Sequence, residues 1–194
     1  GTMYLERSGI LSSADYGLSF VTLLGGELDE DYQKNVSRSF PGKYGSLAIG
    51  IYNGGGYHAI EKNENKMIDG RLSLRPVPEI IPGFQFSFVG AYGKGNVGSS
   101  PEYKTIAGIL SYESRIIDLT GTYYNGTGFE DGGQLNSSGK PPSNNGYSFF
   151  ADFNIPKTPF NLIGRYDNFT SDSGIFKSIS ERYILGFAYY FFGE

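Results

Sequence analysis

The fold is decided by stretches like residues 147–155, which read YSFFADFNI. Aromatic Tyr147 and Phe149 stand on either side of polar Ser148, and the same alternation continues through Asp152. Because successive side chains of a β-strand point to opposite faces, this alternation predicts a strand with one apolar and one polar surface. The same period of two recurs along much of the chain, at residues 68–75, 116–124, 160–167 and 183–191.

Nine segments of the chain have the composition and length of candidate strands. Each runs for roughly ten residues, which is the length that a tilted strand needs to cross a bilayer. Strands of soluble proteins cluster nearer about five or six residues. No stretch approaches the roughly 18 consecutive apolar residues that a membrane-spanning helix needs. The predicted strands are 16–27, 44–53, 67–76, 84–93, 103–113, 116–125, 146–155, 160–169 and 180–191.

The connections between these segments alternate between tight and long. Bacterial outer-membrane barrels place short turns on the periplasmic side and longer loops outside. The tight connections lie at 77–83, 114–115 and 156–159, and two of them contain proline, which ends a strand because it fixes φ and lacks a donor. The long, polar connections lie at 54–66, 94–102, 126–145 and 170–179. Segment 28–43 breaks this alternation of short and long connections. Its place in the order of connections assigns it to the periplasmic side, where short turns are expected, but it is long.

The composition excludes several classes of function. A net charge of −4 provides no basic surface for nucleic acid. The absence of cysteine excludes a disulfide framework and a thiolate metal site. The single histidine cannot form a metal cluster without partners, and no nucleophile–base pair is recognisable. We therefore expect no enzymatic activity, no cofactor, no catalytic or metal-binding residue and no nucleic-acid partner.

These observations predict an all-β chain whose residues 1–194 form a single domain, an antiparallel transmembrane β-barrel. The alternation alone also fits a soluble antiparallel sheet with one wet face. Aromatic residues near the segment ends favour the membrane, because the aromatic girdles of barrels lie at the two interfaces. These residues are Tyr92, Tyr103, Tyr112, Tyr123, Tyr147, Phe160, Tyr183 and Phe191.

Part of the chain is similar to a known family. Residues 45–57 read GSLAIGIYNGGGY, residues 70–76 read GRLSLRP, and Pro82-Gly83-Phe84 follows. These motifs resemble the phosphate-selective porin O/P family of Gram-negative outer membranes and related general porins. The similarity covers residues 15–93, and the rest of the chain shares only the general pattern of alternating strands and turns. The resemblance implies a barrel of about sixteen to eighteen strands, often trimeric, that carries small anions or other solutes.

The chain departs from this family in size. Nine strands in 194 residues are about half of such a barrel, and single-chain bacterial barrels have an even number of strands. Either residues 4–12 supply a tenth strand, or the chain is a portion of a larger barrel. A start in mid-pattern without a leader favours the portion. A selective phosphate site is not carried over, because the basic run that it needs is not recognisable.

The charged residues of the alternating segments fall on the polar side, and we expect them to project into one lumen. Lining charges of both signs favour small dipolar or charged solutes. The alternative is that these charges only neutralise one another across neighbouring strands. The predicted pore-lining residues are Asp69, Arg71, Arg75, Asp118, Asp152, Arg165, Asp167 and Arg182. The predicted lipid-facing residues are Leu72, Leu74, Leu119, Phe153, Leu162, Leu185 and Phe187.

Two functions fit this pattern. The first is a porin of the bacterial outer membrane, a passive diffusion channel for small polar or charged solutes. Its expected partners are membrane lipid, the solutes or ions, and a homotrimer or another membrane protein. The second is a non-conducting barrel that acts as a scaffold, adhesin or partner-binding anchor. Strand number separates them, because about eight to ten strands leave an interior filled by side chains and about sixteen leave an aqueous channel.

Overall fold

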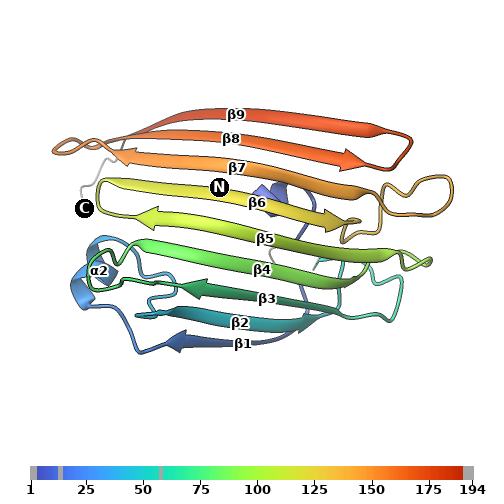
Figure 1. Ribbon diagram of the computed structural model, residues 1–194, viewed down its shortest axis with the longest axis horizontal. Coiled ribbons are helices and arrows are strands. Elements are labelled where there is room, and N and C mark those ends of the chain that lie inside the picture. Colours follow the sequence, from blue (N-terminus) through green and yellow to red (C-terminus); the bar gives the residue numbers. More distant parts are fainter. Residues whose placement is uncertain (1–3, 13–14, 57–58, 190–194) are drawn as a thin grey trace.

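The chain folds into one antiparallel β-sheet (Figure 1). The computed structural model describes residues 4–12, 15–56 and 59–189. Its nine strands are hydrogen-bonded in sequence order. They are β1 (Gly17–Leu24), β2 (Gly45–Tyr52), β3 (Met67–Leu74), β4 (Phe84–Lys94), β5 (Glu102–Glu113), β6 (Ile117–Thr127), β7 (Ser143–Asn154), β8 (Phe160–Asp172) and β9 (Lys177–Tyr189). Two short helices, α1 (Tyr4–Arg7) and α2 (Glu30–Asn35), complete the secondary structure.

The prediction of nine antiparallel strands in an all-β chain is confirmed. One connection differs from the prediction. Residues 170–179 were expected to form a long loop, but the β8–β9 ladder continues to the pair Asp172 and Lys177. Only residues 173–176 remain for the turn. The prediction was wrong here because polar side chains such as Ser171 do not prevent the backbone from pairing.

The two faces of the sheet differ in chemistry, as the alternation predicts. We call them the apolar face and the covered face, because two chain segments pack on the second. Neighbouring strand positions form continuous rows across the sheet. One row of the apolar face is Leu74, Phe86, Leu110, Gly121, Phe149, Tyr166 and Tyr183. One row of the covered face is Ser87, Ile109, Thr122, Ser148, Asp167 and Arg182.

The first covering segment is residues 4–12, which we call the strap. Its helix α1 ends at Arg7, and Gly9, just beyond the helix, adopts a φ of 71°. The amides of Ile10 and Gly9 donate to the carbonyls of Leu5 and Glu6, at 2.9 Å each. This glycine cap brings the side chains of Leu5 and Ile10 into one buried cluster. The strap is therefore no strand, and the alternative that residues 4–12 supply a tenth strand is wrong.

The second covering segment is residues 28–43, which contains α2 and lies at the short-turn end of the sheet (Figure 1). Asp29 caps α2, because its Oδ1 accepts the Tyr32 amide at 2.8 Å. Nη2 of Arg115 in the β5–β6 turn lies 2.6 Å from Oδ2 of Asp31. The segment that broke the sequence rhythm thus packs against the ends and the covered face of the sheet.

The sheet is not closed into a barrel. Within the described residues β1 pairs only with β2, and β9 pairs only with β8. Because nine consecutive strands alternate in direction, β1 and β9 run the same way along the sheet. No helix in the described part of the chain has both the length and the apolarity to span a membrane.

Candidate functional site

The charged residues predicted to line a pore share one face. Seven of them occupy covered-face positions in strands, and Arg75 directly follows β3 with the same parity. Two of the eight meet at a hollow in the covered face. The hollow has a volume of about 340 Å³. It is lined by Tyr4, Leu5, Arg71, Ile109, Ser111, Glu113, Thr120, Thr122, Ser148, Phe150 and Arg165.

Arg165 stands on β8 at one side of the hollow and forms a nearly buried ion pair. Its Nε donates to Oδ1 of Asp167 at 2.7 Å. Oγ of Ser148 on β7 donates to the same carboxylate oxygen at 2.6 Å. The carboxylate of Asp167 is therefore compensated from two strands, while the guanidinium of Arg165 still lines the hollow. The ion pair lies within one strand, so these two charges neutralise each other along β8 and not across neighbouring strands as the alternative expected.

Arg71 stands on β3 at the other side of the hollow. Its Nε donates to Oγ of Ser73 at 3.0 Å, and its Nη2 donates to Oγ of Ser87 at 3.3 Å. The ring of Phe40, from the 28–43 segment, lies 5.6 Å from the guanidinium carbon. No carboxylate of the described residues pairs with Arg71 within salt-bridge distance. Arg71 thus supplies a positive charge to the hollow. The two serine hydroxyls orient its guanidinium group but do not neutralise the charge.

Arg75 has a different environment and does not reach the hollow. Only 1% of its surface is exposed. Its Nε donates to the Pro82 carbonyl at 2.8 Å, and its Nη1 donates to the carbonyls of Gly42 and Phe40 at 2.7 and 3.2 Å. The ring of Tyr32 lies 5.8 Å from the guanidinium carbon. Arg75 therefore fastens the 28–43 segment to the β3–β4 turn.

Three carboxylates form a row toward the short-turn end of the covered face. Asp118 on β6 lies opposite Glu113 on β5 and opposite Asp152 on β7. Oδ1 of Asp118 accepts the Ser114 amide at 3.2 Å, and Oδ1 of Asp152 accepts Nδ2 of Asn161 at 3.0 Å. Glu113 also lines the hollow. The hollow consequently carries charges of both signs, with two arginines and one glutamate among its lining residues.

The remaining two predicted residues lie outside the hollow. Asp69 is half-buried on β3 and forms no part of the hollow lining. Arg182 lies on the edge strand β9, opposite Asp167. It borders a smaller depression of about 200 Å³ whose other lining residues are Tyr4, Arg7, Ser8, Asp167, Phe169 and Ser180.

Sequence reasoning missed Glu113 and the two strap residues of the hollow, Tyr4 and Leu5. Glu113 could have been found, because it continues the polar positions of β5. The strap could have been suspected from Tyr124 and Phe169. Both occupy strand positions that point to the mostly polar face. Aromatic rings at those positions indicate that something apolar packs on them.

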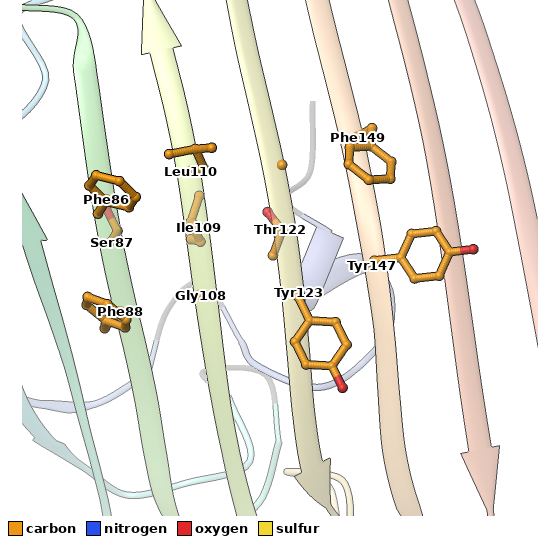
Figure 2. Close-up of a pocket in the computed structure, with 11 residues that line it drawn as sticks. Phe86, Ser87, Phe88, Gly108, Ile109, Leu110, Thr122, Tyr123, Tyr147 and Phe149 are labelled. Atoms are coloured by element: carbon orange, nitrogen blue, oxygen red, sulfur yellow. The ribbon is translucent and has the colours of Figure 1, made fainter.

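The apolar face carries all seven residues predicted to face lipid. Their exposure ranges from half-buried Leu72 to Leu185, which is 91% exposed. Figure 2 shows the rings of Phe86, Phe88, Tyr123 and Phe149 around the bare position of Gly108. Aromatic rings thus surround a shallow groove where a glycine leaves the backbone open.

The expected aromatic girdle needs one correction. Tyr103 belongs to the covered face and is 1% exposed, with its hydroxyl donating to the Ile10 carbonyl at 2.6 Å. It packs against the strap and was assigned to the girdle because it lies near a segment end. Phe191 is outside the described residues. The other six girdle residues lie on the apolar face.

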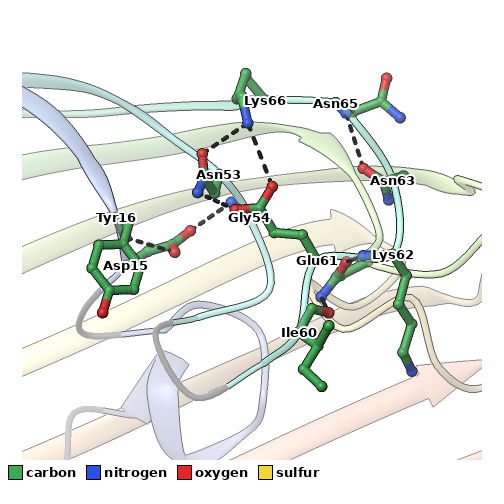
Figure 3. A network of polar contacts seen from close by, with 11 residues as sticks. Asp15, Tyr16, Asn53, Gly54, Ile60, Glu61, Lys62, Asn63, Asn65 and Lys66 are labelled. Carbon is green, nitrogen blue, oxygen red and sulfur yellow. Dashed lines mark hydrogen bonds and ion pairs between the residues drawn. The ribbon is translucent and has the colours of Figure 1, made fainter.

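The loop between β2 and β3 is held beside the start of β1 by a polar network (Figure 3). Oδ2 of Asp15 accepts the Gly54 amide at 2.5 Å. Nζ of Lys66 donates to Oδ1 of Asn53 at 2.8 Å and lies 3.7 Å from Oε2 of Glu61. The network holds the β2–β3 loop against the residues that lead into β1.

The described residues contain no group of three or more His, Cys, Asp or Glu side chains placed to hold a metal ion. No protein-family model, curated protein or solved structure matches the chain.

Proposed function

We propose that the chain is part of an outer-membrane β-barrel that forms a passive diffusion channel for small polar or charged solutes. One observation carries the proposal, the separation of the two faces. Rows of exposed apolar side chains cover one face from β3 to β9, and predicted charged residues occupy the other. A barrel in a membrane presents an apolar exterior and a polar interior, so the covered face would line the lumen.

The lengths of the strands support the same proposal. The strands from β4 to β9 contain 11 to 13 residues. A tilted strand needs about 9–11 residues to cross the hydrocarbon core. These strands are therefore long enough to span the bilayer, with their ends in the two interfaces.

The directions of the edge strands constrain how the proposed barrel closes. Since β1 and β9 run the same way, direct pairing between them would be parallel. An entirely antiparallel barrel needs an odd number of additional strands between these two edges. The resemblance to the phosphate-selective porin O/P family implies about sixteen to eighteen strands, and an even total in that range requires seven or nine more. In this proposal the chain is a portion of a larger porin in the Gram-negative outer membrane. That porin assembles as a homotrimer or with another membrane protein.

A non-conducting barrel that serves as a scaffold, adhesin or partner-binding anchor is the second candidate. The observation in its favour is that the strap and the 28–43 segment both pack on the face that would line the lumen. In a narrow barrel these segments would fill the interior.

Reconstitution in a planar bilayer distinguishes the two functions. The full-length native protein should produce discrete, ohmic conductance steps if it is a channel. Its intact mass should correspond to a barrel of about sixteen strands or more, the size at which an aqueous lumen appears. Membrane insertion without conductance would favour the scaffold, and failure to insert into lipid would exclude both.

A further inference from the structure

The strap is held on the covered face by apolar contacts that the sheet provides for it. A helix as short as α1 is not stable by itself, so packing must hold it in place. Leu5 and Ile10 are 2% and 1% exposed. They share a buried cluster with Ala107 of β5 and Tyr124 of β6. The strap thus docks across neighbouring strands of a face that otherwise carries many polar side chains.

Polar contacts anchor both ends of the strap. The Tyr4 hydroxyl donates to the Asn168 carbonyl of β8. At the other end, the Ser12 amide donates to Oε2 of Glu130 at 2.5 Å. Glu130 belongs to the loop between β6 and β7, is 4% exposed, and also accepts the Gly55 amide at 3.2 Å. The strap is therefore tied directly to β8 and to the β6–β7 loop, and through Glu130 to the β2–β3 loop.

The sheet leaves space for the strap at Gly146 of β7. A Cβ atom at this position would collide with the Tyr4 hydroxyl and with the Asn168 carbonyl. The ring of Tyr4 then packs edge-on against the ring of Tyr124, with 5.5 Å between their centres. A glycine at this covered-face position allows the strap to lie directly on the backbone of the sheet.

The position of the strap determines what it does in the proposed channel. Tyr4 and Leu5 form part of the wall of the central hollow, together with Arg71, Glu113 and Arg165. We infer that the strap is the element that narrows the channel, by occupying lumen beside these charged residues and bringing passing solutes close to them. This inference rests on the proposed function and adds the identity of the constriction. The other covering segment, residues 28–43, is fastened by Arg75 at the short-turn end and contributes no residue to the lining of the hollow. The strap, through its helix α1, is therefore the covering segment that borders the hollow.

The size of the strap fixes the expected effect of its removal. A helix with its side chains is about 10 Å across, which is a large part of an aqueous barrel lumen. Displacing the strap should therefore raise single-channel conductance by about twofold and weaken selectivity between anions and cations.

The experiment compares single-channel conductance of the full-length native protein with that of the double variant Leu5→Asp/Ile10→Asp. The two carboxylates would be buried on docking, so they should keep the strap off the sheet. The matched control is Ile60→Asp, the same type of change at a loop residue that is 83% exposed. The double variant should conduct about twofold more than the native protein, and the control should not differ from it.

A milder variant covers the case in which the double variant does not insert into the bilayer. Tyr103→Phe removes only the hydroxyl that binds the Ile10 carbonyl. Its channels should visit the larger conductance level more often than native channels do. If the native protein forms channels and every variant conducts as it does, the strap is not the constriction, although the proposed channel still stands. Absence of channels from the native protein would overturn the proposed function as well.

Discussion

Arg165 and Asp167 stand two residues apart on β8, with Nε and Oδ1 separated by 2.7 Å and with side chains that are only 12% and 8% exposed. Truncation of Arg165 would remove the charged donor to the Asp167 carboxylate, to which the Ser148 hydroxyl also donates. Loss of one partner of a nearly buried pair therefore adds an uncompensated negative charge to the covered face. The same pair thus links the stability of β8 to the charge of the proposed lumen.

The first prediction concerns ion selectivity. Arg71→Ala and Arg165→Ala should each shift the reversal potential in a salt gradient toward cations, because both remove positive charge from the hollow. A charge acts over roughly 8 Å at physiological salt, so a narrow lumen feels it across its width. Arg71→Lys should retain selectivity. Arg38→Ala, which changes an exposed residue of the 28–43 segment, is the control. Unchanged selectivity in both alanine variants would remove these arginines from the pathway.

The second prediction separates Arg75 from the other arginines. Arg75→Ala should lower the free energy of unfolding by about 3 kcal/mol, because three backbone carbonyls, one of them in a buried hydrogen bond, lose a charged donor. It should leave ion selectivity close to that of the native channel. Arg115→Ala breaks only an exposed ion pair with Asp31 and should cost at most about 1 kcal/mol. Equilibrium unfolding by denaturant measures both values, and equal effects of the two variants would contradict the assignment.

The third prediction tests which face meets lipid. Leu119→Arg should destabilise the protein in lipid vesicles by about 2–4 kcal/mol if Leu119 lies near the bilayer midplane. Thr120→Arg, at the neighbouring covered-face position, should have a smaller effect. Cysteines at these two positions provide an independent readout. The one at 119 should react with a lipid-soluble probe, and the one at 120 with an aqueous thiol reagent. The reverse labelling would exchange the two faces.

The fourth prediction concerns pH and Glu130. Burial raises the pKa of the Glu130 carboxyl, against the lowering effect of the Ser12 and Gly55 amides, and Asp15 raises it further. Since the folded state binds the proton more tightly, this stabilising contribution is complete below the ordinary pKa and is lost as pH rises through the folded-state pKa. The native protein should therefore lose stability relative to Glu130→Gln as pH rises from about 4 through that range. Thermal unfolding at several pH values gives this difference, and a pH-independent difference would refute it.

The sequence predicted which side of the sheet each strand residue occupies far better than it predicted the contacts. Asp118 and Leu119 were assigned correctly to opposite faces, because the pleat of a strand alone sets their directions. Arg75 has the same parity as the lining residues, but its partners are carbonyls of two irregular segments. No local pattern encodes such contacts. The strap was missed for the same reason, since nothing near Leu5 in the sequence specifies a site on β6.

The Tyr4–Asn168 contact joins residues that are 164 positions apart, whereas every strand pairs with its neighbour in sequence. Hairpins between neighbours close short loops, and the entropy of loop closure makes such contacts form early. We therefore expect the sheet to assemble hairpin by hairpin and the strap to arrive last, on a surface that is already complete. Until then the rings of Tyr103, Tyr124 and Phe169 would stay uncovered, which gives a chaperone a defined patch to recognise. Protection of these three residues against oxidative labelling should appear after the hydrogen bonds of the sheet, and simultaneous protection would exclude this order.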